Sequence, residues 1–442
     1  MRKKEYRKLI SMGIVSIMMA GLLTACGESG IMADNTTSQS IEADEADEES
    51  AADVKKESKT SSETEEAEDA KSEKMDNAES ASTGEDIALT DDNDISITKG
   101  GKYTVTGSSK NSTICVETEE EVEIVLDGVS MENETTPCIY VKNADKVTVS
   151  TTENESTLTV TGSFETDGDT KTDAVIFSKD DIDLEGTGVL NIKSSDNAIS
   201  SKDDLKIKSG TLNINCTGNA LEAHDELEVT DGTINITGCN DGLHAKDSDD
   251  DSKGSVLITG GTLDISATDD AVHGTTTVQI DGGELTLKGS ECIEATYIKI
   301  NDGNLNISAS DDGINAAAKS STLTPTFEMN GGTVTISMGA GDTDGVDSNG
   351  DIYINGGTLD ISGQSTFDYD GKAEYKGGTI IENGTTTNTI SGQFFGGQGG
   401  GFGGFGEDRN RDGEFPQNMH GPRGGEFPQD MPQQENNGNE TY

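Results

Sequence analysis

The sequence predicts an all-β fold, a right-handed parallel β-helix solenoid in which each coil of about 22 residues contributes three short strands. Two observations carry this prediction. A phrase of the form Gly-Gly-Thr-Leu-x-Ile recurs along the chain. Within each repeat, three segments alternate apolar and polar residues with a period of two, and no segment has the helical period. The glycines that precede the threonine or its equivalent are Gly210, Gly232, Gly261, Gly283, Gly303, Gly332, Gly357 and Gly378.

One repeat shows how the elements are expected to follow one another. Its three predicted strands span 262–266, 271–274 and 276–280. Weaker repeats extend upstream to about 95–107, so we expect one solenoid domain over 87–392. Two repeats are longer than the rest, because they carry inserts at 246–254 and 317–325, at the same corner between the second and third strands. Inserts on one edge of a solenoid predict a binding rim.

The two ends of the chain have different compositions from the middle. A positive start and a short apolar run predict an export signal over 1–25, and the letters LTAC that end at Cys26 resemble a bacterial lipobox. We therefore expect a lipid on Cys26 and an extracytoplasmic, membrane-anchored protein on the bacterial cell surface. Residues 26–86 are acidic and almost free of large apolar side chains, which predicts a disordered linker. Residues 393–442 are rich in Gly, Phe and Pro, which predicts a disordered tail.

The net charge of -53 limits the possible partners. So acidic a surface repels nucleic acid and anionic lipid, so we expect no nucleic-acid partner and a membrane contact through the lipid anchor alone. The same charge favours cations, neutral surfaces or anionic ligands bridged by a metal. We expect a monomer.

The second strand of each repeat aligns into columns. An aliphatic column that includes Val272 and Ile293 must point into the core. The column before it holds small residues, among them Ala271 and Cys292, and we place Cys115 and Cys138 in the same column as packing residues. Cys216 and Cys239 fall in adjacent coils with different registers, so whether they pair remains open.

The column immediately before the small residues is made of Asn, Asp and Glu. Asx side chains suit a repeated turn, which is a purely structural explanation. Stacked carboxylates are also what Ca²⁺ binds, since this ion takes six to eight oxygen ligands. The metal candidates are Asp241, Asp269, Asp270, Asp311, Asp312 and Asp344.

The column after the aliphatic one is polar and includes His244 and His273. Glu, Asn and Asp occupy the same position in other repeats. A zinc or catalytic histidine needs several fixed partners, and the alignment supplies none. We therefore expect both histidines to be surface residues without a particular role.

The repeats resemble a clostridial carbohydrate-binding β-helix family, a non-catalytic relative of the pectate-lyase fold. The resemblance rests on GGTLDISATDDAVHG and DGNLNISASDDGINA, and it covers most of 87–392. It implies a module that binds cellulose or polygalacturonate and carries calcium. By this resemblance the metal lies along Asp241, Asp270, Asp312 and Asp344. The family's sugar-contacting residues cannot be placed on this sequence.

A catalytic β-helix is the less favoured alternative. Polysaccharide hydrolases and lyases with a similar β-helix fold use basic residues in catalysis. This sequence has no arginine between residues 87 and 392. Lysine can substitute, and Lys246, Lys253, Lys288 and Lys299 are expected near the candidate face. We predict a protein that is not an enzyme.

Aromatic residues are scarce for a sugar-binding protein, and tryptophan is absent. Tyr297, Tyr353 and Tyr369 are weak candidates for a sugar platform, and Tyr375 lies near them in the sequence; the alternative is that they cover the last coils. The sequence thus predicts a non-catalytic surface lipoprotein that binds an extracellular polysaccharide with the help of calcium. A structural or adhesive solenoid without a sugar ligand is the rival prediction.

Overall fold

The computed structural model describes residues 79–81, 84–341 and 343–392. The predictions for the export signal, Cys26, most of the linker and the Gly-rich tail lie outside these residues. Over the described residues the chain forms strands and no helix, so this part holds no helix long and apolar enough to cross a membrane.

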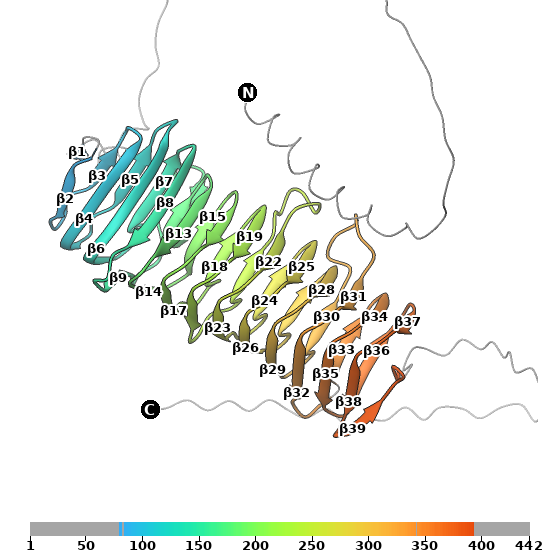
Figure 1. Cartoon of the computed structure of the whole chain (residues 1–442). Coiled ribbons are helices and arrows are strands. Elements are labelled where there is room, and N and C mark those ends of the chain that lie inside the picture. Colours follow the sequence, from blue (N-terminus) through green and yellow to red (C-terminus); the bar gives the residue numbers. More distant parts are fainter. Residues whose placement is uncertain (1–78, 82–83, 342, 393–442) are drawn as a thin grey trace, which may run out of the picture. The chain divides into compact units, whose positions relative to one another are not determined.

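The predicted parallel β-helix is confirmed (Figure 1). Each regular coil runs through three strands, and each strand pairs in parallel with its equivalents one coil before and one coil after. The coils therefore build three faces, here called face 1, face 2 and face 3. Each face is a ladder of strands one coil apart.

Face 1 is a separate sheet within the described residues. Its strands are β1 (Glu79–Ala81), β3 (Ile95–Ile97), β5 (Ile114–Glu117), β7 (Ile139–Asn143), β12 (Ala174–Ser178), β15 (Asn197–Ser201), β18 (Leu221–Ala223), β21 (Leu243–Ala245), β24 (Val272–Gly274), β27 (Ile293–Ala295), β30 (Ile314–Ala316), β33 (Asp344–Ser348) and β36 (Ser365–Tyr369).

Face 2 follows face 1 along each coil. Its strands are β2 (Asp86–Leu89), β4 (Gly101–Lys110), β6 (Glu121–Asn133), β8 (Lys146–Thr151), β13 (Ile182–Gly186), β16 (Leu205–Ile207), β19 (Glu226–Val229), β22 (Ser255–Ile258), β25 (Thr277–Ile280), β28 (Tyr297–Ile300), β31 (Thr326–Met329), β34 (Asp351–Ile354) and β37 (Ala373–Tyr375).

Face 3 joins face 2 because the long strand β6 pairs with both β8 and β9. Its strands are β9 (Ser156–Val160), β14 (Val189–Ser194), β17 (Thr211–Asn215), β20 (Thr233–Ile236), β23 (Thr262–Ser266), β26 (Glu284–Gly289), β29 (Asn304–Ala309), β32 (Thr333–Met338), β35 (Thr358–Ser362), β38 (Thr379–Glu382) and β39 (Thr385–Thr387). The last strand is antiparallel to β38 and closes this end of the ladder.

The recurring glycine phrase marks the corner between face 2 and face 3. Every glycine of the predicted column has a positive φ, for example 76° at Gly332. A Cβ at Gly332 would lie 2.8 Å from the carbonyl oxygen of Gly303, one coil away. This corner therefore needs glycine both for its backbone conformation and for the close approach of neighbouring coils.

The core is a ladder of aliphatic side chains, as predicted. Val272 of β24 pairs in register with Leu243 and Ile293 on the neighbouring strands, and all three are fully buried. Stacking of equivalent residues makes each coil cover the apolar surface of the next, which is why no single coil is expected to fold alone.

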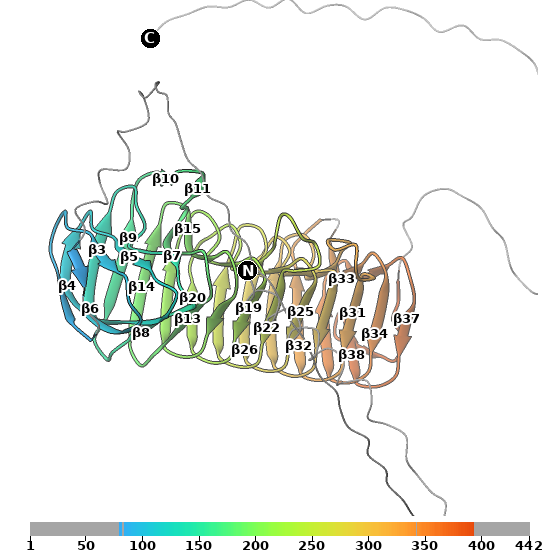
Figure 2. The ribbon, with the colours of Figure 1, turned by 90° about the horizontal axis from the view of Figure 1, so that it is seen from above.

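The two predicted inserts stand out from the corner between face 1 and face 2, where Figure 1 shows them as long loops before β22 and β31. They contact each other, because the backbone N–H of Ser321 donates to Oδ2 of Asp251 at 2.8 Å. A third projection is the hairpin of β10 (Thr166–Asp167) and β11 (Thr170–Lys171), visible in Figure 2. The two inserts are thus joined across the coils between them, and their role as a binding rim stays a prediction.

The structured region begins earlier than the predicted boundary at residue 87. Strand β1 lies within the range predicted as linker, and it pairs in parallel with β3. The alternating pattern of β2 also begins before that boundary, at Asp86.

Candidate functional site

Face 1 carries the polar columns that the sequence predicted. Backbone hydrogen bonds and strand register place equivalent residues of successive coils side by side. We call Asn197, Asn219, Asp241, Asp270, Glu291, Asp312 and Asp344 the first column. We call Ser200, Glu222, His244, His273, Glu294, Asn315, Asp347 and Asp368 the second column.

The small-residue column between them is also confirmed, with one correction. Cys138 and Cys292 are fully buried beside the aliphatic ladder. Cys115 does not belong there, because it follows Ile114 and pairs with Tyr140 on the outward side of face 1. A single apolar segment, Ile-Cys-Val, fits either of two registers, and the sequence prediction chose the wrong one.

Cys216 and Cys239, whose pairing the sequence left open, are both free, buried thiols in the structure. Burial in apolar surroundings raises the pKa of each thiol above its ordinary value. They are packing residues of the solenoid.

The first column has a structural role that differs from the predicted turn. One side-chain oxygen accepts a hydrogen bond from the backbone N–H of the next coil: Asn197 from Asn219 at 2.7 Å, Asp241 from Asp270 at 3.1 Å, and Asp312 from Asp344 at 3.0 Å. The carboxylate thus joins two coils, where the prediction had it bonding to its own turn. In Asp241 this leaves the second carboxylate oxygen free to contact the second column.

That second oxygen meets a histidine in two successive coils. Oδ2 of Asp241 lies 2.6 Å from Nδ1 of His244, and Oδ2 of Asp270 lies 2.7 Å from Nδ1 of His273. The two imidazole rings stack, with centroids 4.6 Å apart and planes at 10°. The expectation that the histidines are surface residues without a role is therefore wrong for His273, which is only 7% exposed. The repeated spacing Asp-x-x-His was the available signal.

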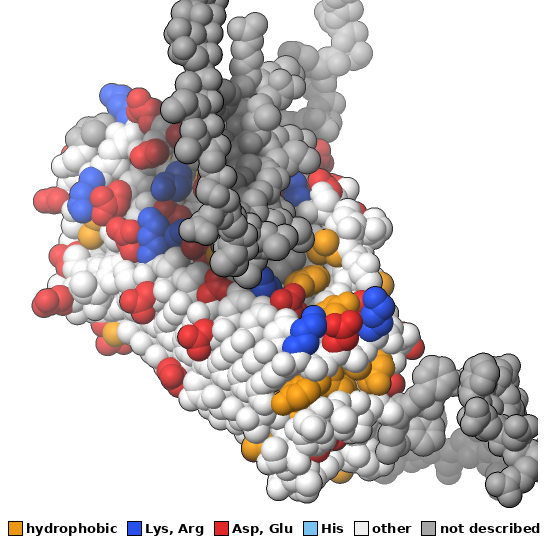
Figure 3. All heavy atoms as spheres, turned by 45° about the vertical axis from the view of Figure 1, so that its right-hand side comes forward, with side chains coloured by type: hydrophobic (Ala, Val, Ile, Leu, Met, Phe, Trp, Pro, Cys, Tyr) orange, Lys and Arg blue, Asp and Glu red, His pale blue; other side chains and the backbone are white. Residues whose placement is uncertain are grey.

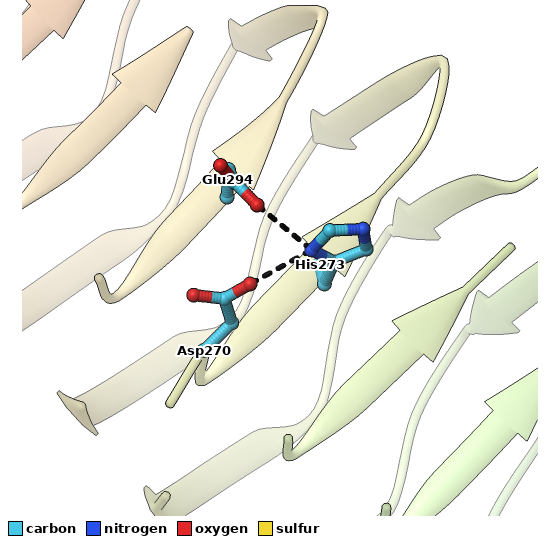
Figure 4. A group of neighbouring side chains, drawn as sticks. All are labelled: Asp270, His273 and Glu294. Carbon is cyan, nitrogen blue, oxygen red and sulfur yellow. Dashed lines mark hydrogen bonds and ion pairs between the residues drawn. The ribbon is translucent and has the colours of Figure 1, made fainter. Parts of the chain in front are cut away.

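His273 also reaches the next coil. Its Nδ1 lies 3.0 Å from Oε2 of Glu294, and Oε1 of Glu294 is 2.7 Å from Nζ of Lys319 in the second insert. Figure 4 shows the imidazole placed between the two carboxylates of Asp270 and Glu294. The sequence alignment placed Glu294 in the same column as His273 but did not reveal the contact between them, and it missed Lys319 because that residue belongs to an insert.

The charges in this cluster compensate one another. Burial alone would lower the pKa of His273, but its hydrogen bonds to Asp270 and Glu294 raise that pKa to about 9. Burial alone would raise the pKa of Glu294, but hydrogen bonds from His273 and Lys319 hold it well below its ordinary value. At neutral pH the imidazolium and the ammonium therefore neutralise the two carboxylates.

Further along face 1 the acidic groups have no such compensation. In the part of the chain that the structure describes, no ion pair joins Glu291, Asp312 or Asp347 to a basic side chain. Burial, followed by repulsion from Glu294, raises the pKa of Glu291. Burial and the carboxylates of Asp312 and Asp368 raise the pKa of Asp347 to about 7. Like charges held this close repel one another, which disfavours the ionised forms of these carboxyl groups.

We call Glu291, Asp312, Asn315 and Asp347 the acidic stretch, and its one amide has an oxygen without a hydrogen-bond partner. Nδ2 of Asn315 donates to Oε2 of Glu291 at 3.1 Å, while its Oδ1 is buried and has no hydrogen-bond partner. Asn315 is 9% exposed, and it pairs in register with Asp347. A buried acceptor beside uncompensated carboxylates is the donor set that Ca²⁺ prefers. The oxygen donors gathered here are of the kind that a calcium ion binds.

The structure divides the six predicted metal ligands. Asp241 and Asp270 belong to the histidine pairs. Asp312 lies in the acidic stretch, where its side chain accepts a hydrogen bond from the backbone N–H of Asp344. Asp269 and Asp311 stand one residue before the first column and are exposed. The six carboxylates therefore do not converge on one point.

The predicted lysines lie elsewhere. Lys288 is on β26 of face 3 and Lys299 is on β28 of face 2. Nζ of Lys253, at the end of the first insert, lies 2.6 Å from Oδ1 of Asp225. Lys246 is exposed at the start of the same insert. The lysines that reach the second column are Lys202 and Lys319, which bind Glu222 and Glu294.

The tyrosines are not on the polar columns. Tyr297 and Tyr353 belong to face 2, where their hydroxyls donate to Glu328 and Asp351. Tyr369 ends β36 and packs with Tyr375 against the end of the core. Figure 3 shows hydrophobic side chains gathered at this end of the solenoid. Tyr369 and Tyr375 thus cover the last coils, which was the alternative prediction for the cluster.

The described residues thus form a parallel β-helix that carries carboxylates along part of face 1. Comparison with known proteins gives its family: a model described as "Carbohydrate-binding domain-containing protein" matches residues 91–340 and 292–394, and the chain belongs to this family.

Two known proteins are similar to the chain. A carbohydrate-binding domain-containing protein of Acetivibrio thermocellus is 35% identical over 123 residues, which are 26% of this chain and 43% of that protein. The match thus spans less than half of the relative. The solved structure of a polysaccharide lyase-like protein from C. thermocellum, a gadolinium derivative, has 24% sequence identity and a TM-score of 0.38, and the match covers 66% of this chain and 98% of that chain.

Proposed function

We propose that the protein is a non-catalytic, cell-surface module that holds an acidic polysaccharide of the polygalacturonate type on face 1 through bound calcium. The observation that supports this most strongly is the acidic stretch around Asn315. Asp312 and Asp347 have raised pKa values, and among the described residues no ion pair joins either to a basic side chain. The buried amide oxygen of Asn315 beside them has no hydrogen bond.

Calcium links the two acidic partners in this proposal. A polyuronate and a protein of net charge -53 repel each other in the absence of a cation. Ca²⁺ takes six to eight oxygens, so an ion held by Asp312, Asn315 and Asp347 keeps coordination positions for ligand carboxylates. Cellulose lacks the carboxylates for such a bridge, which makes it the less favoured of the two polysaccharides.

The rest of the column supports binding without catalysis. The imidazole and the lysine nearest to the acidic stretch are both engaged with Glu294. A base for proton abstraction must be able to accept a proton, and an imidazolium with a pKa of about 9 holds its proton at neutral pH.

The localisation belongs to the same proposal: a lipid on Cys26 holds a monomer at the outer side of the membrane.

The test is a pull-down of the full chain on insoluble polygalacturonate. We expect retention in millimolar calcium and loss of retention when a calcium chelator is added, with restoration by excess calcium. Retention that is insensitive to the chelator contradicts the calcium bridge. Release of unsaturated uronides from the matrix contradicts the absence of catalysis.

A further inference from the structure

A second kind of metal site is suggested by the cluster around His273, outside the acidic stretch proposed for calcium. Nδ1 of His273 lies 2.7 Å from Oδ2 of Asp270 and 3.0 Å from Oε2 of Glu294, and donor atoms of all three residues lie within 4.8 Å of one another. All three residues are buried, with exposures of 7%, 5% and 4% for His273, Asp270 and Glu294. Figure 4 shows the three side chains converging on one point.

We propose that His273, Asp270 and Glu294 form a binding site for a divalent transition-metal ion of the zinc class, which takes the place of the Nδ1 proton. This site is distinct from the proposed calcium site, and it does not depend on the proposed function. Its ligands are one imidazole nitrogen and two carboxylate oxygens.

The distances suit such an ion. Zinc lies about 2.0–2.2 Å from nitrogen and carboxylate ligands, so neighbouring ligands of one ion are separated by about 3.0–3.4 Å. The observed separations of 2.7 and 3.0 Å need only a small outward movement of the carboxylates. Calcium is disfavoured, because it needs more ligands, longer bonds and oxygen atoms in place of the imidazole nitrogen.

Neighbouring groups already hold two of the three ligands, Glu294 and His273, in place. The ammonium of Lys319 binds the second oxygen of Glu294 at 2.7 Å, which fixes the carboxylate orientation. The ring of His273 stacks on that of His244, and His244 is itself held by Asp241 at 2.6 Å. Outer contacts of this kind orient metal ligands in known sites.

The chemistry of the exchange is balanced. The metal ion binds the nitrogen lone pair after Nδ1 gives its proton to solvent, so one proton is released for each ion bound. Binding therefore strengthens as the pH rises. The charge of the ion replaces that of the imidazolium, and Lys319 keeps its contact with Glu294.

His244 provides a matched control. It has the same Asp-x-x-His spacing, the same ring orientation and the same Nδ1–carboxylate contact, one coil away. Its Nδ1 has one carboxylate partner, whereas that of His273 has two. Loss of the His244 side chain should remove a supporting contact and leave all three proposed ligands.

The experiment titrates the untagged full chain, stripped of metal with a chelator, with Co²⁺ and then Zn²⁺. We expect one equivalent of Co²⁺ to give a visible d–d spectrum that Zn²⁺ abolishes and that millimolar Ca²⁺ leaves unchanged. H273N should weaken binding by more than about 100-fold, because loss of an outer contact alone typically costs about 10–100-fold. E294Q should weaken it by at least about 10-fold, and H244N by less than E294Q.

Circular dichroism establishes that each variant is folded, and E294Q serves as the deciding variant if H273N is not. The proposal is overturned if neither Co²⁺ nor Zn²⁺ binds, if H273N or E294Q binds as the wild type does, or if H244N loses as much affinity as H273N. A thiolate charge-transfer band in place of the expected spectrum identifies a cysteine as ligand and also overturns it. Chelator-sensitive retention on polygalacturonate is measured in zinc-free buffer, so the two proposals fail separately.

Discussion

At the scale of single residues, the position of a carboxylate along face 1 decides what it does. Asp270 and Glu294 share the imidazolium of His273, and Glu294 also binds the ammonium of Lys319. Asp347 instead lies between Asn315 and Asp368 on the neighbouring strands. Carboxylates of face 1 are therefore paired with basic side chains in some coils and lie beside other acidic groups in coils further along. This difference between coils arises from the residues that the second column and the inserts place beside each carboxylate.

The imidazole of His273 should titrate far from that of His224 in metal-free protein. Two carboxylates raise the pKa of His273 to about 9, whereas burial, followed by the charge of Lys202, lowers that of His224. Nuclear magnetic resonance of the imidazole protons between pH 5 and 10 checks this. Titration of both rings at the same pH contradicts the assignment of charge in the cluster.

The linked effect on stability has a defined sign. The folded-state pKa of His273 lies above its ordinary value of 6.5, so the stabilisation that it provides is complete below pH 6.5 and is lost as the pH rises through about 9. The difference in free energy of unfolding between wild type and H273N, measured with urea without metal, should shrink over this range. A difference that grows with pH contradicts the prediction.

At the scale of elements, neighbouring strands place similar aliphatic residues in the core and different residues on the outside of the solenoid. Ile293 of β27 is fully buried in register with Val272 and Ile314. Replacement by alanine leaves a cavity that one coil cannot close alone. We expect I293A to lose about 2–5 kcal/mol of unfolding free energy by urea denaturation. A loss below about 1 kcal/mol contradicts a tightly stacked ladder.

The two inserts act as one element because Asp251 accepts the backbone N–H of Ser321. We expect D251A to speed hydrogen exchange of the amides in 317–325 and to leave the exchange of the strands on either side unchanged. Mass spectrometry of deuterated peptides measures both. D249A, two residues away at an exposed position, is the matched control, and equal exchange in D251A and D249A contradicts the tie between the inserts.

Much of the fold could be predicted because it repeats. The glycine of the recurring phrase, the alternating strands and the aliphatic ladder each appear in several coils, so chance matches average out. The register of Cys115 was missed because its coil lacks the phrase. The site was harder, since the contacts of Glu294 with His273 and Lys319 cross coils and inserts. An alignment of the repeats shows which residue types share a position. It does not show the contacts of those residues with neighbouring coils or with the inserts.

At the scale of the whole molecule, the sequence predicts that the solenoid is exported and anchored. Replacement of Cys26 by alanine removes the acceptor of the lipid. We expect the wild type in the membrane fraction of the producing cell and C26A in the soluble extracytoplasmic fraction. Immunoblots of the fractions test this, and C26A that remains with the membrane contradicts lipid anchoring.

The central claim is that face 1 holds an acidic polysaccharide through calcium bound at the acidic stretch. The most direct measurement compares calcium-dependent retention of D347N and D360N on polygalacturonate. Asp347 lies on face 1, and Asp360 lies on β35 in the same coil but on face 3. We predict that folded D347N loses chelator-sensitive retention and that D360N keeps that of the wild type. Retention of D347N at the wild-type level, or equal loss in both variants, would contradict the account.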